Sequence, residues 1–365
     1  MRLRRSPNIV AYWDGRHFVM EEFVRRRRIT ALPVVATLLQ RFDRPRSIHT
    51  VARSFGSYSP ASVAREIRRL LGLGFLSRVG GRRDDGDDVF GAWKGCFAAR
   101  YYHFATSNVR YPTDEEGRGR YIQDRLQAAP QPRLFKDYVG RPRFPLADDA
   151  RPPADMALGA ALSERRTARE FARRAVSFPD LARIVFGTWG QTGSVDTGLL
   201  GKLVLKTSPS AGARHPIECY LLAWNIEKLR PGLYHYSVRG NCLERMRAGD
   251  LRRCAVRMAA GQGWIQRSAF MCVMTAVADR VFWKYPTSDA YRLFFLDAGH
   301  LAQTFVLLAT ARGLGAYTTA AMDERMIQTT LGLDGRSEFP VYICGAGARA
   351  DAGVSRVVSV NHRLR

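Results

Sequence analysis

In the second half of the chain, stretches with apolar residues at alternate or successive positions are interspersed with stretches of helical periodicity. The alternating or continuous apolar runs predict strands at 217–224, 232–238, 269–277 and 339–345. The helical patterns predict helices at 155–170, 179–189, 292–312 and 323–331. The 292–312 segment is apolar on almost every side, so this helix is expected in the interior. The pattern from Asp155 onward therefore predicts an α+β domain.

The first 85 or so residues carry a different pattern. A short hairpin is predicted over 12–19, and apolar residues at helical spacing predict a helix within 31–42. Ser59 followed by Pro60 predicts the start of another helix, because Ser caps helices and Pro is tolerated at the first helical position. The apolar stripe of this helix ends before Gly72. Together with the following segment GLGFLSRV, these elements resemble a winged-helix unit.

Composition changes along the chain suggest three parts. The run GGRRDDGDD at 80–88 is a polar, glycine-bearing linker. We therefore expect a winged-helix-like domain at 1–88, and peptide binding is one candidate role for it. An irregular, proline-dotted connecting segment follows at 89–154. The α+β domain occupies 155–365.

The bulk composition favours a cytoplasmic protein with packed cores. Apolar residues make up 46% of the chain and aromatic residues 11%, which excludes global disorder. The longest apolar run noted, 269–278, is too short to cross a bilayer, and the basic start lacks the apolar segment of a secretory signal. We therefore expect no membrane association.

Charge and cysteine content add little to this prediction. The net charge of +24 raises the question of an anionic partner, but the basic residues are spread along the chain and nearly all are arginine. Binding to nucleic acid or to an acidic peptide therefore remains a minor alternative, with DNA disfavoured. The six cysteines form no CxxC pair, so neither a zinc site nor a disulfide framework is expected.

The stretch TSPSAGARHPIECYLLAWNIEKLRPGLYHYS at 207–237 is the most informative part of the sequence. A turn of small residues precedes two predicted strands. Small side chains let backbone N–H groups approach a planar or phosphorylated ligand closely. The stretch is therefore a candidate cofactor loop.

Two other motifs carry candidate chemistry. The run SERRTAREF at 163–171 closes a predicted helix with several arginines, which could clamp a phosphate or simply complement the helix dipole. Lys284 and Tyr285 lie between a buried strand and the long helix, where a desolvated Lys could act as a general base; an ordinary surface loop is the alternative. No P-loop, dinucleotide-binding glycine motif or nucleophile elbow is present.

The order of these motifs carries a resemblance that no single motif does. The succession RRTxRxF, PSAGARHPxExY with GLYHY, then KYP, DAGHxAQ and GLG resembles the FMN-dependent nitroreductase fold. Within that fold it is similar to the SagB-type dehydrogenases, which oxidise thiazoline and oxazoline rings in peptides. The resemblance begins near Tyr101 and includes the segments YYHFAT and PRLFKDYVGRPRFPL. It implies a central antiparallel sheet flanked by helices, in a dimer with bound FMN.

The resemblance also implies roles for individual residues. Around the FMN phosphate and ribityl chain it implies Arg165, Arg166, Thr167, Arg169 and, by a looser match, Arg349. Beside the flavin, across a dimer interface, it implies Pro209, Ser210, Ala211, Gly212 and Ala213. Gly313, Leu314 and Gly315 would approach the isoalloxazine, and Lys284 and Tyr285 match the catalytic Lys-Tyr pair. The implied partners are an azoline-containing precursor peptide and a second copy of the chain, and association with a cyclodehydratase is allowed.

The sequence departs from the family pattern at three places. Thr167 replaces a Ser and keeps its hydroxyl group, and Thr304 replaces an Asn. Arg214 and His215 replace apolar and aromatic residues and add charge near the flavin, which makes them candidate substrate contacts. None of these changes removes an essential group.

Two other functions stay open. A nitroreductase-like flavin enzyme could act on a nitroaromatic compound, or on an aminoacyl or cyclic-dipeptide substrate. Alternatively, a winged helix with Arg65, Arg68 and Arg69 on its third helix could bind DNA in a redox sensor. A similar unit in peptide-modifying systems captures a leader peptide, and we rank this role or plain scaffolding above DNA binding.

Overall fold

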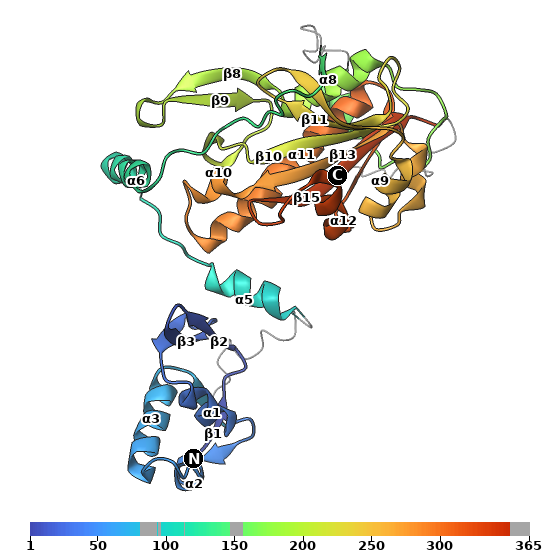
Figure 1. The fold of residues 1–365 in the computed structure, drawn as a ribbon. Coiled ribbons are helices and arrows are strands. Elements are labelled where there is room, and N and C mark those ends of the chain that lie inside the picture. The colour runs from blue at the N-terminus through green and yellow to red at the C-terminus, as the bar shows by residue number, and fades with distance from the viewer. Residues whose placement is uncertain (81–92, 94–95, 113, 147–155, 351–365) are drawn as a thin grey trace, which may run out of the picture. The chain divides into compact units, whose positions relative to one another are not determined.

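The computed structural model describes residues 1–80, 93, 96–112, 114–146 and 156–350. The chain forms two compact units, Met1–Arg110 and Tyr111–Arg365 (Figure 1). The boundaries expected from the sequence, at 88 and 154, both fall outside the described residues. These boundaries therefore stay predictions.

The first unit combines short strands with helices, and α1, α2 and α3 of these pack around one apolar core. Its elements are β1 (Arg2–Arg5), β2 (Ile9–Asp14), β3 (His17–Glu22), β4 (Arg27–Thr30), α1 (Val34–Gln40), β5 (Arg46–Ser47), α2 (Ile48–Ser54), α3 (Pro60–Gly72), β6 (Leu76–Arg78) and α5 (Phe97–Ala105). Strand β1 lies between β5 and β6, while β2, β3 and β4 form a second antiparallel sheet. The predicted hairpin over 12–19 is thereby confirmed as the turn between β2 and β3.

Helix α3 begins where its sequence predicts. Ser59 has an extended backbone, and its hydroxyl oxygen accepts a hydrogen bond from the N–H of Ser62 at 3.2 Å. Val63, Ile67 and Leu70 are buried in the core of this unit, as the apolar stripe predicts. Arg69 forms an ion pair with Glu66 on the same helix at 2.7 Å, whereas Arg65 and Arg68 form none with the residues that the structure describes.

The second unit is built around a seven-stranded antiparallel sheet. Its elements are α6 (Glu115–Ala128), β7 (Arg143–Pro145), α7 (Leu158–Glu164), α8 (Phe178–Trp189), β8 (Gln191–Asp196), β9 (Lys202–Lys206), β10 (Ile217–Ala223), β11 (Gly232–Ser237), β12 (Cys242–Ala248), α9 (Arg252–Met258), β13 (Phe270–Val277), α10 (Ala278–Phe282), α11 (Tyr291–Ala311), β14 (Leu314–Thr319), α12 (Glu324–Leu331) and β15 (Glu338–Ala348). The strand order is β14-β15-β13-β10-β11-β12-β7, and β8 pairs with β9 apart from it. The expected α+β fold with a central antiparallel sheet flanked by helices is confirmed.

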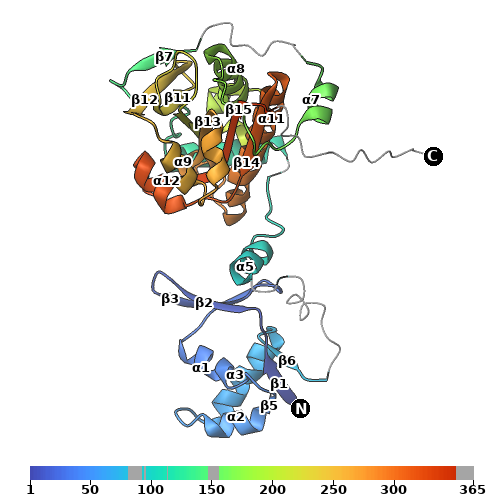
Figure 2. The same ribbon diagram turned by 90° about the vertical axis from the view of Figure 1, so that its right-hand side faces the viewer.

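Alternating side chains of the central strands fill two apolar cores. In β13, Cys272 and Met274 face the core that α8 and α11 complete, while Met271 and Val273 face the core that α9 and α12 complete. Figure 2 shows these helix pairs on opposite faces of the sheet. The sheet is covered on both sides, which explains why β10 and β13 are apolar at nearly every position.

Helix α7 is much shorter than the helix predicted at 155–170. It ends at Glu164, and Arg165 already has an extended backbone. The next residues pair with the sheet instead: the Ala168 N–H donates to the Ala316 carbonyl oxygen at 2.8 Å, and Thr167 bridges Ala316 in parallel. Pairing with a strand far away in sequence therefore overrides the local helical pattern.

Helix α11 is the long apolar helix that the sequence predicts in the interior. By length and composition alone, α11 with its preceding turn (Ser288–Ala311) could cross a membrane. This segment was not identified from the sequence, where the longest apolar run noted was 269–278. Half of its most apolar window is buried within the protein. Since Phe294, Ala298 and Phe305 pack into the core, the fold accounts for the apolar composition of one face of α11, while Phe295 and Leu296 are exposed on the other.

Candidate functional site

The loop between β9 and β10 has an unusual backbone. Gly212, Ala213 and His215 have φ angles of 59°, 53° and 44°. Left-handed conformations cost energy in residues with a Cβ, so they persist only where the surroundings enforce them. This loop, predicted as a cofactor loop, is therefore held in a specific shape.

Helix α11 supplies the side chains that hold the loop. Asp297 accepts a hydrogen bond from the Ser210 hydroxyl at 2.5 Å, and the Thr304 hydroxyl lies 2.6 Å from the Ser208 hydroxyl. Between them, His300 Nδ1 lies 3.3 Å from the carbonyl oxygen of Pro209. Positions 297, 300 and 304 share one helix face, because they are three and four residues apart.

This anchoring set was missed as a functional group in the sequence, where the motif DAGHxAQ served only for the resemblance. Its signal was the spacing of three polar residues along an otherwise apolar helix. Burial raises the pKa of Asp297, although the Ser210 hydroxyl bond opposes this rise. The pKa of the Asp297 carboxylate therefore depends on both its burial and its hydrogen bond to the loop.

The predicted Lys-Tyr pair lies directly against this loop. A Cβ built on Gly212 would lie 2.7 Å from Lys284 Nζ and 2.5 Å from the Tyr285 hydroxyl oxygen. Both functional atoms therefore touch the Gly212 backbone, and only glycine leaves them room. The fold thus brings together Lys284, Tyr285 and the loop, which are some seventy residues apart in the sequence.

Helix α6 holds the backbone that carries this pair. The Tyr121 hydroxyl donates to the carbonyl oxygen of Lys284 at 2.7 Å, and Arg125 Nε donates to that of Trp283 at 2.7 Å. Trp283 Nε1 in turn donates to the Ala129 carbonyl oxygen at 2.8 Å. The pair is therefore positioned from two sides, by the loop and by α6.

The two side chains of the pair have opposite pKa shifts. Burial lowers the pKa of Lys284, and the nearby positive charge of Arg214 lowers it further. Burial also raises the pKa of Tyr285, and the neighbouring Tyr121 acts in the same direction. The surroundings thus favour the neutral form of both groups, and a neutral amine is the stronger proton acceptor of the two.

Arg214 and His215, the candidate substrate contacts, are enclosed by protein. The Arg214 side chain is fully buried. His215 Nε2 lies 2.9 Å from the Val204 carbonyl oxygen, and burial lowers the pKa of His215 to about 4. His215 is therefore neutral at neutral pH.

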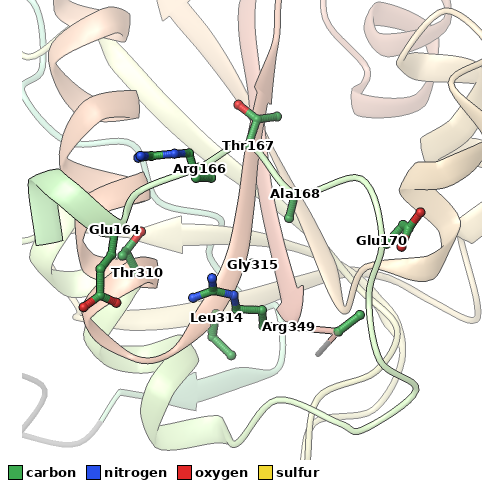
Figure 3. A pocket seen from close by; sticks show the side chains of 10 residues that line it. Glu164, Arg166, Thr167, Ala168, Glu170, Thr310, Leu314, Gly315 and Arg349 are labelled. Atoms are coloured by element: carbon green, nitrogen blue, oxygen red, sulfur yellow. The ribbon is translucent and has the colours of Figure 1, made fainter. Parts of the chain in front are cut away.

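A second group of predicted residues lines a separate pocket. Arg166, Thr167, Leu314, Gly315 and Arg349 surround it together with Glu164, Ala168, Glu170, Thr310 and Ala350. Figure 3 shows Arg166 and Arg349 reaching this pocket from opposite ends of the domain sequence. The remaining predicted residues Arg165, Arg169 and Gly313 do not line it.

The lining of this pocket is mixed in charge: Glu164 and Glu170 are acidic, and Arg166, Thr167 and Arg349 are the groups that could hold an anion. Two guanidinium groups and one hydroxyl group can donate to phosphate oxygens. Strand β14 also passes close to the arginine segment, since a Cβ on Gly315 would lie 2.8 Å from the Cβ of Ala168. Among the described residues, no cluster of three His, Cys, Asp or Glu side chains has metal-binding geometry.

The two groups lie at different points along α11. Thr310 borders the arginine pocket, while Asp297 borders the small hollow that Ser210 and His215 line. Thirteen residues of helix separate these positions, which corresponds to about 20 Å. The arginine pocket and the hollow beside the loop are therefore two separate places within one chain.

Comparisons with known proteins agree with this architecture. The Nitroreductase family matches residues 162–348, which is half of the chain. The trifolitoxin-processing protein TfxB of Rhizobium leguminosarum bv. trifolii is 25% identical over 311 residues, covering 80% of this chain and 82% of TfxB. The microcin B17-processing protein McbC of Escherichia coli is 26% identical over 145 residues, covering 38% of this chain and 53% of McbC.

A solved structure shares the fold as well. A protein from Anabaena variabilis classed as a nitroreductase superposes with a TM-score of 0.50 at 20% identity. The match covers 67% of this chain and 49% of the Anabaena protein, so this chain spans about half of that protein's length. Because the family match covers half of the chain, including six of the seven strands of the central sheet, the chain belongs to the nitroreductase family.

Proposed function

We propose that this protein is a cytoplasmic FMN-dependent dehydrogenase that oxidises thiazoline or oxazoline rings to azoles in a ribosomally made peptide. Membership of the nitroreductase family supports the oxidoreductase class. The similarity to proteins named for processing trifolitoxin and microcin B17 supports a peptide substrate. The observation that carries the proposal is the packing of Lys284 Nζ and the Tyr285 hydroxyl on Gly212.

The arginine pocket is the half-site that we assign to the FMN phosphate. Arg166, Thr167 and Arg349 would donate to its oxygens, and Arg165 and Arg169 extend the positive charge of the same segment. The backbone at 313–315 would approach the ring system, where a side chain at Gly315 has no room. When bound, FMN supplies a hydride acceptor.

Oxidation of an azoline ring releases a proton from one ring carbon and a hydride from its neighbour, which leaves a new double bond between them. We assign the proton to Lys284 Nζ, which is half-buried and whose lowered pKa favours the unprotonated amine. The Tyr285 hydroxyl, held against the same glycine, would orient the ring as a hydrogen-bond donor. The loop 209–213 excludes water from one side of the pair.

Two copies of the chain would complete each site. The two half-sites lie about 20 Å apart along α11, so a site shared between protomers would unite the arginine pocket of one with the loop of the other. Phe295 and Leu296 of α11 are 47% and 55% exposed, and Val195, Leu199 and Leu205 are exposed on the β8–β9 hairpin. These apolar surfaces support a homodimer.

For the first unit we propose capture of the precursor peptide, in an assembly that can include a cyclodehydratase. A cavity of about 290 Å³ lies beside α3 and is lined mainly by apolar residues, among them Leu32, Leu38, Phe55 and Tyr58. An apolar cavity suits side chains of a peptide better than a DNA backbone. Full-length protein titrated with precursor peptide and with duplex DNA separates the two partners, and tighter salt-resistant binding of DNA would contradict the peptide role.

The catalytic assignment is tested by replacing the pair. We expect Lys284→Ala and Tyr285→Phe to keep bound FMN but to lose ring oxidation, measured by mass spectrometry as the loss of two hydrogens. Lys228→Ala, at an exposed position, is the matched control and is expected to stay active. Turnover retained in both variants would refute the assignment. Reduction of a nitro compound by NAD(P)H without any azoline oxidation would instead favour the small-molecule flavin enzyme.

A further inference from the structure

Arg214 is a buried cation that lacks an anionic partner. Its side chain is fully buried, and no carboxylate in the described part of the chain lies within ion-pair distance of it. The neighbouring Arg280 is buried too, but it pairs with Glu218 at 2.6 Å. Burying a charge without a counter-ion is costly. A fold that keeps such a charge beside a candidate catalytic pair invites a functional explanation.

The groups that hold Arg214 are all neutral. Its Nε donates to the carbonyl oxygen of Arg280 at 2.9 Å. With the Gln131 amide oriented to satisfy both of its ends, the amide oxygen accepts from Arg214 Nη1 at 2.6 Å. The guanidinium carbon lies 5.1 Å from the ring centroid of Trp283, and Nη2 is buried without a hydrogen-bond partner. These contacts fix the position of the charge without neutralising it.

The charge lies next to the predicted base. Trp283, on which the guanidinium rests, directly precedes Lys284, and Lys284 Nζ packs on Gly212, two residues before Arg214. Burial lowers the pKa of Lys284, and the positive charge of Arg214 lowers it further. Burial and Arg280 lower the pKa of Arg214 itself to about 10, so Arg214 remains a cation at neutral pH.

Other polar groups also surround the Lys-Tyr pair. They are Tyr121 and Arg125 on α6, Arg280 on α10 and Asp297 on α11, besides Tyr285 itself. Burial, Tyr121 and Asp297 raise the pKa of Tyr285, and Arg214 opposes them. For Lys284, Arg214 is the charged side chain that adds to the effect of burial in lowering the pKa. Among these groups, Arg214 is therefore the one suited to control the protonation of the lysine.

We infer that Arg214 is a positioning residue whose fixed, buried charge disfavours the ammonium form of Lys284. The catalytic consequence rests on the proposed function: a larger fraction of Lys284 is then ready to take the proton of the substrate ring. The ring proton would move from carbon to Nζ, which would become an ammonium, and bound FMN would supply the acceptor for the hydride. Arg214, which departs from the family pattern, thus acts on the proposed base Lys284 rather than directly on the substrate.

The test measures the protonation of Lys284 without any substrate. The chain has six lysines, so reductive methylation with ¹³C-formaldehyde gives few NMR signals, and the signal lost in Lys284→Arg identifies Lys284. In the wild-type holoprotein we expect the pKa of Lys284 to lie below the ordinary lysine value. In Arg214→Met its titration midpoint should move up toward that value, and Arg214→Lys should keep it low.

A second variant leaves Arg214 in place and so avoids a folding defect. Gln131→Glu puts a carboxylate 2.6 Å from Nη1 and should neutralise the guanidinium, raising the midpoint of Lys284 in the same way. If the titration midpoint of Lys284 stays unchanged both in Gln131→Glu and in folded Arg214→Met, the inference is overturned. Failure of the wild-type enzyme to oxidise azolines would refute the proposed function but leave this midpoint test intact.

Discussion

Gly212→Ala is the most informative single substitution, because the structure gives its consequences at atomic detail. The new Cβ would lie 2.5 Å from the Tyr285 hydroxyl oxygen and 2.7 Å from Lys284 Nζ, whereas an ordinary contact begins at 3.4 Å. Both atoms end flexible side chains, so they can retreat while the fold survives. The left-handed φ of 59° adds a strain of about 1–2 kcal/mol.

The expected loss is therefore catalytic more than structural. Each functional atom has to move by most of an ångström, and a misplacement of about 1 Å costs on the order of 100-fold in rate. We expect kcat for ring oxidation to fall by about that factor, with FMN content unchanged and the free energy of unfolding reduced by only about 1–2 kcal/mol. Single-turnover kinetics and urea unfolding measure the two effects.

Gly332→Ala is the matched control for the backbone strain. Gly332 ends α12 with a φ of 70°, and a Cβ there meets no atom within 4 Å. This variant should lose similar stability and keep full activity. A Gly212→Ala enzyme that is as active as Gly332→Ala would refute the packing of the Lys-Tyr pair on the loop.

Two further predictions concern the arginine pocket and the acid stability of the domain. Arg349→Ala removes charge-assisted donors of about 1.5–3 kcal/mol, so the Kd for FMN should rise roughly 10- to 100-fold in a flavin fluorescence titration, while exposed Arg336→Ala should leave it unchanged. The Arg280 guanidinium overcomes the effect of burial and lowers the pKa of Glu218 from 4.5 to about 2. A depressed carboxyl pKa stabilises the fold above about pH 4.5, by on the order of 3 kcal/mol, and that stability is lost as the pH falls toward 2. Glu218→Gln should flatten this part of the curve of unfolding free energy against pH, and an unchanged curve would contradict the ion pair.

Local signals in the sequence were sufficient for the elements with strong caps or continuous apolar patterns. Helix α12 begins after Asp323, as predicted, and its carboxylate accepts from the Met326 N–H at 2.9 Å. The strand predicted at 269–277 is β13, and the helix predicted at 292–312 is α11. Burial on both faces of β13 leaves a continuous apolar pattern, and the periodic apolar face of α11 is equally visible in the sequence.

Elements that depend on distant partners were not predicted. Strand β14 follows Gly313 and is stabilised by pairing with β15 along its whole length. Strand β8 carries only one large apolar residue, Val195, and α7 stops early because the segment after it joins β14. Pairing of this kind leaves no periodic signal in the strand itself.

The candidate site shows the same division. Residue types and motif order indicated Lys284, Tyr285 and the small-residue loop. What could not be read from the sequence is that Gly212 serves as the surface on which the pair packs, or that Arg214 is buried beside it. Both facts depend on the turn of a loop with left-handed residues, which side-chain identity alone does not encode.

The central claim is tested most directly by mass spectrometry of one reaction. FMN-loaded protein is incubated under air with a synthetic peptide that carries a single thiazoline, alongside Lys284→Ala and Lys228→Ala. We predict that wild type and Lys228→Ala remove two hydrogens from the peptide and that Lys284→Ala does not. A peptide left unchanged by the FMN-loaded wild type, or oxidised equally by Lys284→Ala, would contradict the account.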